Sequence, residues 1–183
     1  MRSVAVVAVV AGVALGASAS ANASLVPRAA EREISETVPR QFAYVPARAP
    51  HGWHYHSWDA GRETPGLFPR GRGLNVWFST PYPNQFCPSC TNRNAYGAGF
   101  HVYADSRCSI RDGTETFDVG KSRVAWSATY EDALAWRCVR VRNVLVRISL
   151  SFSGTASTGQ RFAARRAAAV ARMVASAHQI RLH

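Results

Sequence analysis

The sequence is poor in acidic residues, contains a single lysine and has no long hydrophobic run after its first 23 residues. Its 11 acidic residues are outnumbered by 22 basic ones, which gives a formal net charge of +11, and every basic residue except Lys121 is an arginine. Such an excess of positive charge favours anionic partners, such as envelope polymers. Because the arginines are scattered rather than gathered in one run, a solvated basic surface is the simpler interpretation.

Several familiar motifs are also missing. No Gly-x-Ser-x-Gly pattern marks a serine nucleophile, and Glu115 stands where a phosphate-binding loop ending in Gly120-Lys121-Ser122 needs a glycine. No cysteine precedes Cys87, which argues against a lipid-modified N-terminal cysteine, and no twin arginine precedes the first apolar run. We therefore expect no catalytic residue, no cofactor and no metal as the first interpretation.

The first residues have the layout of a secretory signal peptide. Arg2 precedes a short apolar run, Val4 to Leu15, and small residues surround positions 19–23. We expect cleavage after Ala23 or Ala21, which places the mature chain in an oxidising compartment and argues against a nucleic-acid partner. No later segment approaches the roughly 20 apolar residues of a membrane-spanning helix, so a retained signal anchor is the only alternative.

A proline- and alanine-rich stretch, residues 24–50, follows the predicted signal and is interpreted as a lead-in or linker. One or two helical turns fit Ala29 to Glu36, and the flanking prolines limit any longer helix. The remainder, residues 51–183, is expected to form a single domain. The prolines of the stretch are Pro27, Pro39, Pro46 and Pro50.

The clearest strand pattern runs from Asn143 to Phe152, where apolar residues occupy alternate positions. A polar turn at 140–143 joins it to the segment before it, which predicts an antiparallel hairpin with one buried face. The other segments with strand-like patterns are Trp53–Trp58, Leu74–Ser79, Gly99–Ala104, Ser122–Ala128 and Leu134–Val139.

A helix is predicted from about Thr158 to His178, with an apolar stripe on one face and arginines on the other. Strands followed by a terminal helix predict the α+β class, as an antiparallel sheet of about five to six strands with this amphipathic helix packed on one face. The stripe consists of Phe162, Ala169, Val170, Met173, Val174 and Ala177.

The four cysteines, an even number in a chain with a predicted signal, indicate two disulfides. Three pairings are open, and we favour Cys87 with Cys90 and Cys108 with Cys138. The Cys-x-x-Cys spacing also occurs in thiol–disulfide oxidoreductases, where it opens a helix. Residues 91–97 are polar and turn-like, so a structural role for Cys87 and Cys90 is favoured over redox catalysis.

Histidines offer a second alternative. His54 and His56 lie two residues apart, so on a regular strand they would point to the same face, an arrangement suited to zinc or copper. Nothing in the sequence brings further ligands to them. Histidines on the solvent-exposed face of an aromatic strand are the simpler interpretation.

Four segments together carry a family resemblance: Pro50–Tyr55, Val124–Trp126, Val144–Ser151 and Arg165–Ala177. Their layout resembles small exported bacterial domains of unknown function, built like the C-terminal domains of periplasmic anti-sigma-factor regulators. The resemblance covers roughly residues 45–178. It implies an accessory or sensing role outside the membrane without an active site, and it assigns no functional residue.

The sequence thus predicts a secreted, disulfide-stabilised, non-catalytic binding or accessory domain, associated with the cell envelope or released outside the cell. Anionic envelope polymers are the partners that its charge favours. The alternatives are a metal-binding protein that uses His54 and His56, and a thiol–disulfide oxidoreductase at Cys87 and Cys90.

Overall fold

The computed structural model describes residues 25–60, 73–79, 96–128, 132–153 and 167–181. Residues 167–175 form a C-terminal helix. The other elements, in chain order, are α1 (Arg28–Thr37), the 3₁₀ helix η1 (Arg40–Phe42), β1 (Tyr44–Val45), β2 (His54–Ala60), β3 (Leu74–Ser79), β4 (Tyr96–Ala104), β5 (Glu115–Val119), β6 (Ser122–Ala128), β7 (Asp132–Val141), β8 (Val144–Ser153) and β9 (His178–Gln179).

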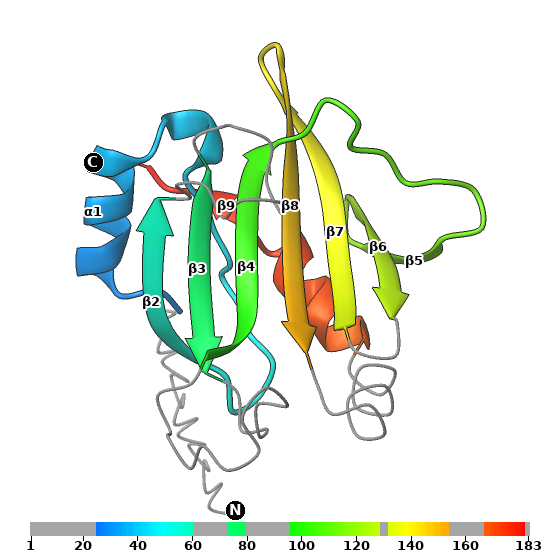
Figure 1. Ribbon diagram of the computed structural model, residues 1–183, viewed down its shortest axis with the longest axis horizontal. Coiled ribbons are helices and arrows are strands. Elements are labelled where there is room, and N and C mark those ends of the chain that lie inside the picture. Colours follow the sequence, from blue (N-terminus) through cyan, green and yellow to red (C-terminus); the bar gives the residue numbers. More distant parts are fainter. Residues whose placement is uncertain (1–24, 61–72, 80–95, 129–131, 154–166, 182–183) are drawn as a thin grey trace, which may run out of the picture.

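The strands form one large antiparallel sheet and one small one. The large sheet has seven strands in the order β2-β3-β4-β8-β7-β6-β5, and β1 pairs with β9 separately (Figure 1). The α+β class is therefore confirmed, but the expectation of five to six strands was too low. The missed strand of the large sheet is β5, Glu115–Val119, whose polar composition gives no clear apolar alternation.

One face of the large sheet, called here the back face, carries the hydrophobic core. Because side chains alternate along strands, every second residue of the central strands points to this face. The C-terminal helix packs behind the sheet (Figure 1) and adds Val170, Met173 and Val174 to the same core. The buried strand residues of the back face are Leu74, Val76, Phe78, Ala98, Phe100, Val102, Val124, Trp126, Ala135, Val146, Ile148 and Leu150.

The C-terminal helix ends earlier than predicted. It stops at residue 175, and His178, expected to be helical, begins strand β9 instead. Ser176 explains the exit, because its hydroxyl donates to the Met173 carbonyl at 2.8 Å and accepts the backbone N–H groups of Ala47 and Arg48. Residues 158–166 of the predicted helix lie outside the described residues.

The stretch interpreted as a linker belongs to the folded domain. Val26, Ala30, Ile34, Val38 and Phe42 are all buried, and Ala30 and Ile34 lie one turn apart on the same face of α1. They join the same core as the sheet, while α1 lies beside β2 (Figure 1). The predicted short helix is confirmed, but the interpretation of the segment as a lead-in outside the domain was wrong.

Two sequence predictions fall outside the described residues: the signal peptide, residues 1–23, and the pair Cys87 and Cys90. Within the described part of the chain, no helix is long and apolar enough to cross a membrane.

Replacing Ile34 by alanine tests whether α1 is part of the domain. Ile34 is fully buried, so we expect Ile34→Ala to lower the free energy of unfolding by about 2–4 kcal/mol, measured by urea denaturation. Alanine favours helix, so the loss reports packing rather than helix propensity. Arg32→Ala, at an exposed position of the same helix, is the control. Equal stability of both variants would show that α1 is not packed on the sheet.

Candidate functional site

The other face of the sheet, called here the front face, carries a row of polar residues. Strand register places Asp59, Asn75, His101, Ser149 and Trp136 side by side across five adjacent strands. Asn75, His101 and Ser149 are buried, unlike most polar residues in proteins. Buried polar groups need hydrogen-bond partners, so the row indicates a network.

Hydrogen bonds join three residues of this row, on β2, β3 and β4, and continue to Ser151 on β8. The Asn75 amide donates to Asp59 Oδ1 at 2.8 Å, and Asn75 Oδ1 lies 2.9 Å from His101 Nδ1. The His101 ring leans along its strand so that Nε2 lies 3.0 Å from Ser151 Oγ. Gly99 permits this, because a Cβ there would lie only 2.6 Å from His101 Nε2. Ser151, His101, Asn75 and Asp59 therefore form one continuous chain.

The chain fixes the tautomer of His101. Because the Asn75 amide nitrogen faces Asp59, its oxygen faces the imidazole and accepts from Nδ1–H, which leaves Nε2 to accept from the Ser151 hydroxyl. Burial lowers the pKa of His101 to about 4, with Asp59 partly opposing the shift. A general base works best with a pKa near the operating pH, so the lowered pKa of His101 favours a structural role for the chain Ser151–His101–Asn75–Asp59.

The stability of the protein should therefore depend on His101 below neutral pH. The pKa of His101 is lowered from 6.5 to about 4, so the unfolded chain binds a proton that the folded protein resists. The contribution of His101 to the free energy of unfolding is therefore fully present above about pH 6.5. It falls as the pH is lowered towards about 4, by about 3 kcal/mol in total. We expect His101→Gln to flatten urea-unfolding stability between pH 6.5 and 4. An identical pH dependence in both proteins would contradict this assignment.

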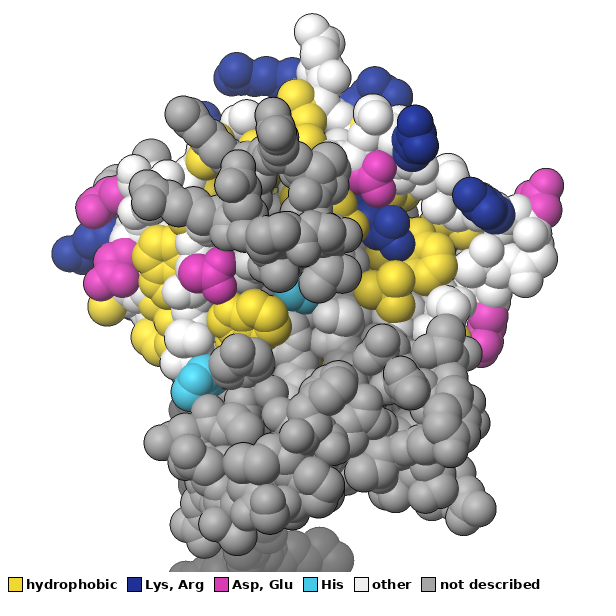
Figure 2. Space-filling model, viewed as in Figure 1, with side chains coloured by type: hydrophobic (Ala, Val, Ile, Leu, Met, Phe, Trp, Pro, Cys, Tyr) yellow, Lys and Arg dark blue, Asp and Glu magenta, His cyan; other side chains and the backbone are white. Residues whose placement is uncertain are grey.

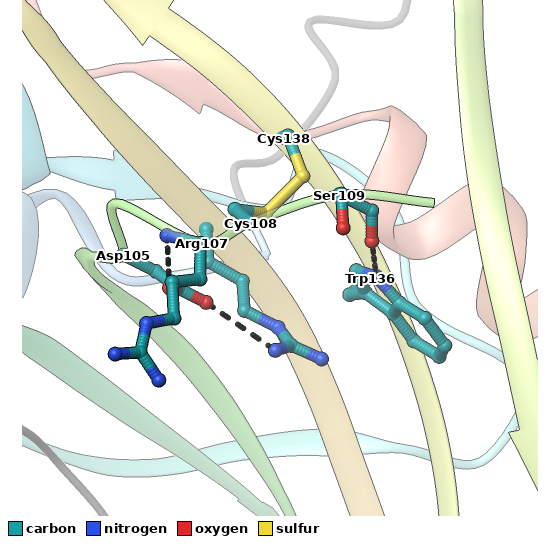
Figure 3. The surroundings of a disulfide bond; sticks show 7 residues. Asp105, Arg107, Cys108, Ser109, Trp136 and Cys138 are labelled. Atoms are coloured by element: carbon teal, nitrogen blue, oxygen red, sulfur yellow. Dashed lines mark hydrogen bonds and ion pairs between the residues drawn. A yellow bond between two sulfur atoms is a disulfide. The ribbon is translucent and has the colours of Figure 1, made fainter. Parts of the chain in front are cut away.

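The predicted disulfide between Cys108 and Cys138 is confirmed. It ties the connection that follows β4 to strand β7 (Figure 3). Asp105 turns the chain towards Cys108, because its carboxylate accepts the Arg107 N–H at 2.9 Å and pairs with Arg147 at 3.4 Å. The next residue is held as well, since the Trp136 indole donates to the carbonyl of residue 109 at 3.3 Å.

Beside the disulfide the sheet splits. The pairing of β6 with β7 extends only from Ala128 and Ala133 to Ala125 and Trp136. Strand β7 continues to Val141 in partnership with β8 alone. The start of β6 and the end of β7 therefore diverge, and a pocket of about 560 Å³ opens between them. Its lining residues are Cys108, Ser109, Ile110, Lys121, Ser122, Arg123, Arg137, Cys138, Val139 and Arg140.

This pocket is strongly basic. Lys121, Arg123, Arg137 and Arg140 line it, and none of the described residues in its lining is acidic. The nearest acidic partner found for these four is Asp118, which lies 3.9 Å from Arg123 in an exposed, weak ion pair. Basic side chains also gather around the β7–β8 hairpin on the face shown in Figure 2. We call the ten lining residues the basic pocket and treat it as the candidate binding site.

Arg137 holds the two sides of the split together. Its guanidinium donates to Ser122 Oγ at 2.8 Å and to the Ala177 carbonyl at 2.7 Å, which links β7 to β6 and to the end of the C-terminal helix. Its Nε is buried and has no hydrogen-bond partner. Burial also lowers the pKa of Arg137, with a smaller opposing effect from Tyr44.

The histidine pair is not assembled into a metal centre in the described part of the chain. His54 and His56 lie exposed on β2, and the register shifts between Tyr55 and Ser57, so His56 lies at a strand irregularity. No group of three metal-ligating side chains occurs among the described residues. His101 supplies no further ligand to the histidine pair, because both of its ring nitrogens are engaged in the chain to Asn75 and Ser151.

Comparison with known proteins adds no relative: the chain matches no protein-family model, no curated protein and no solved structure. The resemblance to exported regulator domains thus stays a prediction.

Removing the disulfide tests its contribution. Cys108 and Cys138 close a segment with a sequence separation of 30, and the loop-entropy model gives a stabilisation of about 3–4 kcal/mol for it. We expect a Cys108→Ser/Cys138→Ser variant to lose this amount in urea denaturation at neutral pH. A loss below about 1 kcal/mol would show that Asp105 and Trp136 hold the segment without the crosslink.

Proposed function

We propose that the protein is an extracytoplasmic binding domain for anionic polymers and that the basic pocket is its binding site. One observation carries the proposal: four cationic side chains line the pocket, and none of the described lining residues is acidic. Like charges gathered in one place repel one another, and among the described residues only Arg123 has an acidic partner, so an anion in the pocket would relieve the repulsion.

The shape of the pocket supports a polymer rather than a small buried ligand. Its volume of about 560 Å³ lies in the range of ligand sites, and three of its four cations are exposed. An open site of this kind suits a chain that passes through it. The Cys108–Cys138 disulfide is consistent with an oxidising compartment outside the cytoplasm, as the signal-like first residues predict.

Binding of labelled polymers tests the proposal. We expect the protein to bind polyphosphate, polygalacturonate or both in fluorescence anisotropy at 50 mM salt, to bind much more weakly at about 300 mM salt, and to ignore neutral dextran. Replacing Lys121, Arg123 and Arg140 by glutamine should weaken binding about tenfold, because each exposed charge contact contributes on the order of 0.5 kcal/mol.

The matched control removes the same charge elsewhere. Arg28, Arg32 and Arg172 are exposed and lie outside the basic pocket, so their triple glutamine variant should keep most of the affinity. Equal losses in both triple variants would mean that net charge alone attracts the polymer. That outcome would overturn the assignment of the pocket.

A further inference from the structure

The most informative charge in the basic pocket is that of Arg137. Unlike the other three cations it is partly buried, and no carboxylate of the described residues pairs with it. Its two hydrogen-bond acceptors, the Ser122 hydroxyl and the Ala177 carbonyl, are both neutral. The third side of the guanidinium, Nε, has no acceptor.

A partly buried cation with neutral partners is unfavourable unless an anion compensates it. Withdrawal from water penalises the charged form, which agrees with the direction of the Arg137 pKa shift. A counter-anion in the pocket would offset that penalty. Each terminal guanidinium nitrogen carries a second hydrogen, so Arg137 can keep its bonds to Ser122 and Ala177 while it donates to a ligand.

The donors of the pocket come from three separate segments. Lys121 and Ser122 lie where β5 turns into β6, Arg140 lies near the end of β7, and Ser109 lies on the segment tied by the disulfide. The Ser122 hydroxyl already accepts from Arg137, and its own hydrogen has no acceptor among the described residues. An anion in the pocket is therefore offered hydrogen bonds from several directions.

This spread of donors fits a tetrahedral oxoanion better than a carboxylate. A phosphate group presents oxygens in several directions, and it carries one negative charge inside a polymer and about −1.5 to −2 as a terminal group at neutral pH. A carboxylate presents two oxygens in one plane and a single charge. One guanidinium can bind both oxygens through two parallel hydrogen bonds. The number of cations and hydroxyl donors in the pocket exceeds what a carboxylate requires.

We propose that the basic pocket binds phosphate-type oxoanion groups, with Arg137 at its base and Ser122 beside it. This inference rests on the proposed function and narrows it: the anionic polymer that the domain recognises carries phosphate groups rather than carboxylates. The role of Arg137 is then twofold, because it also joins β7 to the C-terminal helix.

Small anions test whether the pocket prefers a phosphate group to a carboxylate, without the general attraction of a highly charged polymer. Inorganic phosphate and acetate are titrated into the full protein at constant ionic strength and pH 7.5, followed by ¹H–¹⁵N NMR. We expect phosphate to bind at least tenfold more tightly than acetate, with shifts at residues 109, 122 and 137. Equal affinities, or shifts elsewhere only, would overturn the inference.

Binding of polyphosphate and of polygalacturonate distinguishes the phosphate preference from the proposed function, which is binding of anionic polymers in general. Preference for polyphosphate over polygalacturonate, lost in the Lys121, Arg123 and Arg140 triple variant, supports both. Equal binding of the two polymers, with the same loss in the variant, upholds the proposed function and overturns the phosphate preference. Failure of both polymers to bind at low salt overturns both proposals.

Arg137→Lys tests the guanidinium itself, because lysine keeps the positive charge but lacks the planar set of N–H donors. We expect the variant to lose most of the preference for phosphate over acetate, whereas Arg172→Lys, at an exposed helical position, keeps it. Ser122→Ala gives a second measurement if Arg137→Lys does not fold, and it should weaken phosphate binding several-fold. Unchanged phosphate binding in a folded Arg137→Lys and in Ser122→Ala would overturn the assigned site.

Discussion

Strand β8 is the constraint on which the rest of the structure depends, because it pairs along its whole length with β7 and from Val146 to Phe152 with β4. One face of β8 presents Val146, Ile148 and Leu150 to the hydrophobic core, and Ser149 and Ser151 lie on the polar front face. A one-residue slip of this strand would exchange the two faces. The apolar back and the polar front of the whole sheet are thus set by one register.

Unequal strand lengths then create the candidate binding site. β7 remains paired with β8 as far as Val141, whereas its pairing with β6 ends at Trp136, so the sheet opens towards one end. Arg137 bridges the two strands at this opening, and the disulfide fixes the segment around Cys108 to β7 beside it. The basic pocket therefore lies where the pairing of β6 with β7 has ended. Its lining includes Lys121, Arg123, Arg137 and Arg140.

Local pattern predicted much of the fold but little of the site. Leu74–Ser79 and Ser122–Ala128 are strands with the predicted bounds, because apolar alternation there reflects a single buried face. The buried role of Ile34 was missed, since the prolines around α1 were interpreted as signs of a linker. The partners of His101 and Arg137 depend on which strands are neighbours and where their pairing ends. Neither property is encoded in any one segment, so sequence motifs gave no signal for them.

The central claim is that the basic pocket between β6 and β7 binds anionic polymer. Hydrogen–deuterium exchange with and without polyphosphate, at low salt, tests it most directly because it maps contact without a mutation. The account predicts slower exchange in three segments that are distant in sequence: 108–110, 121–123 and 137–140. Protection confined to strands β2 to β4, or spread evenly over all exposed arginines, would contradict it.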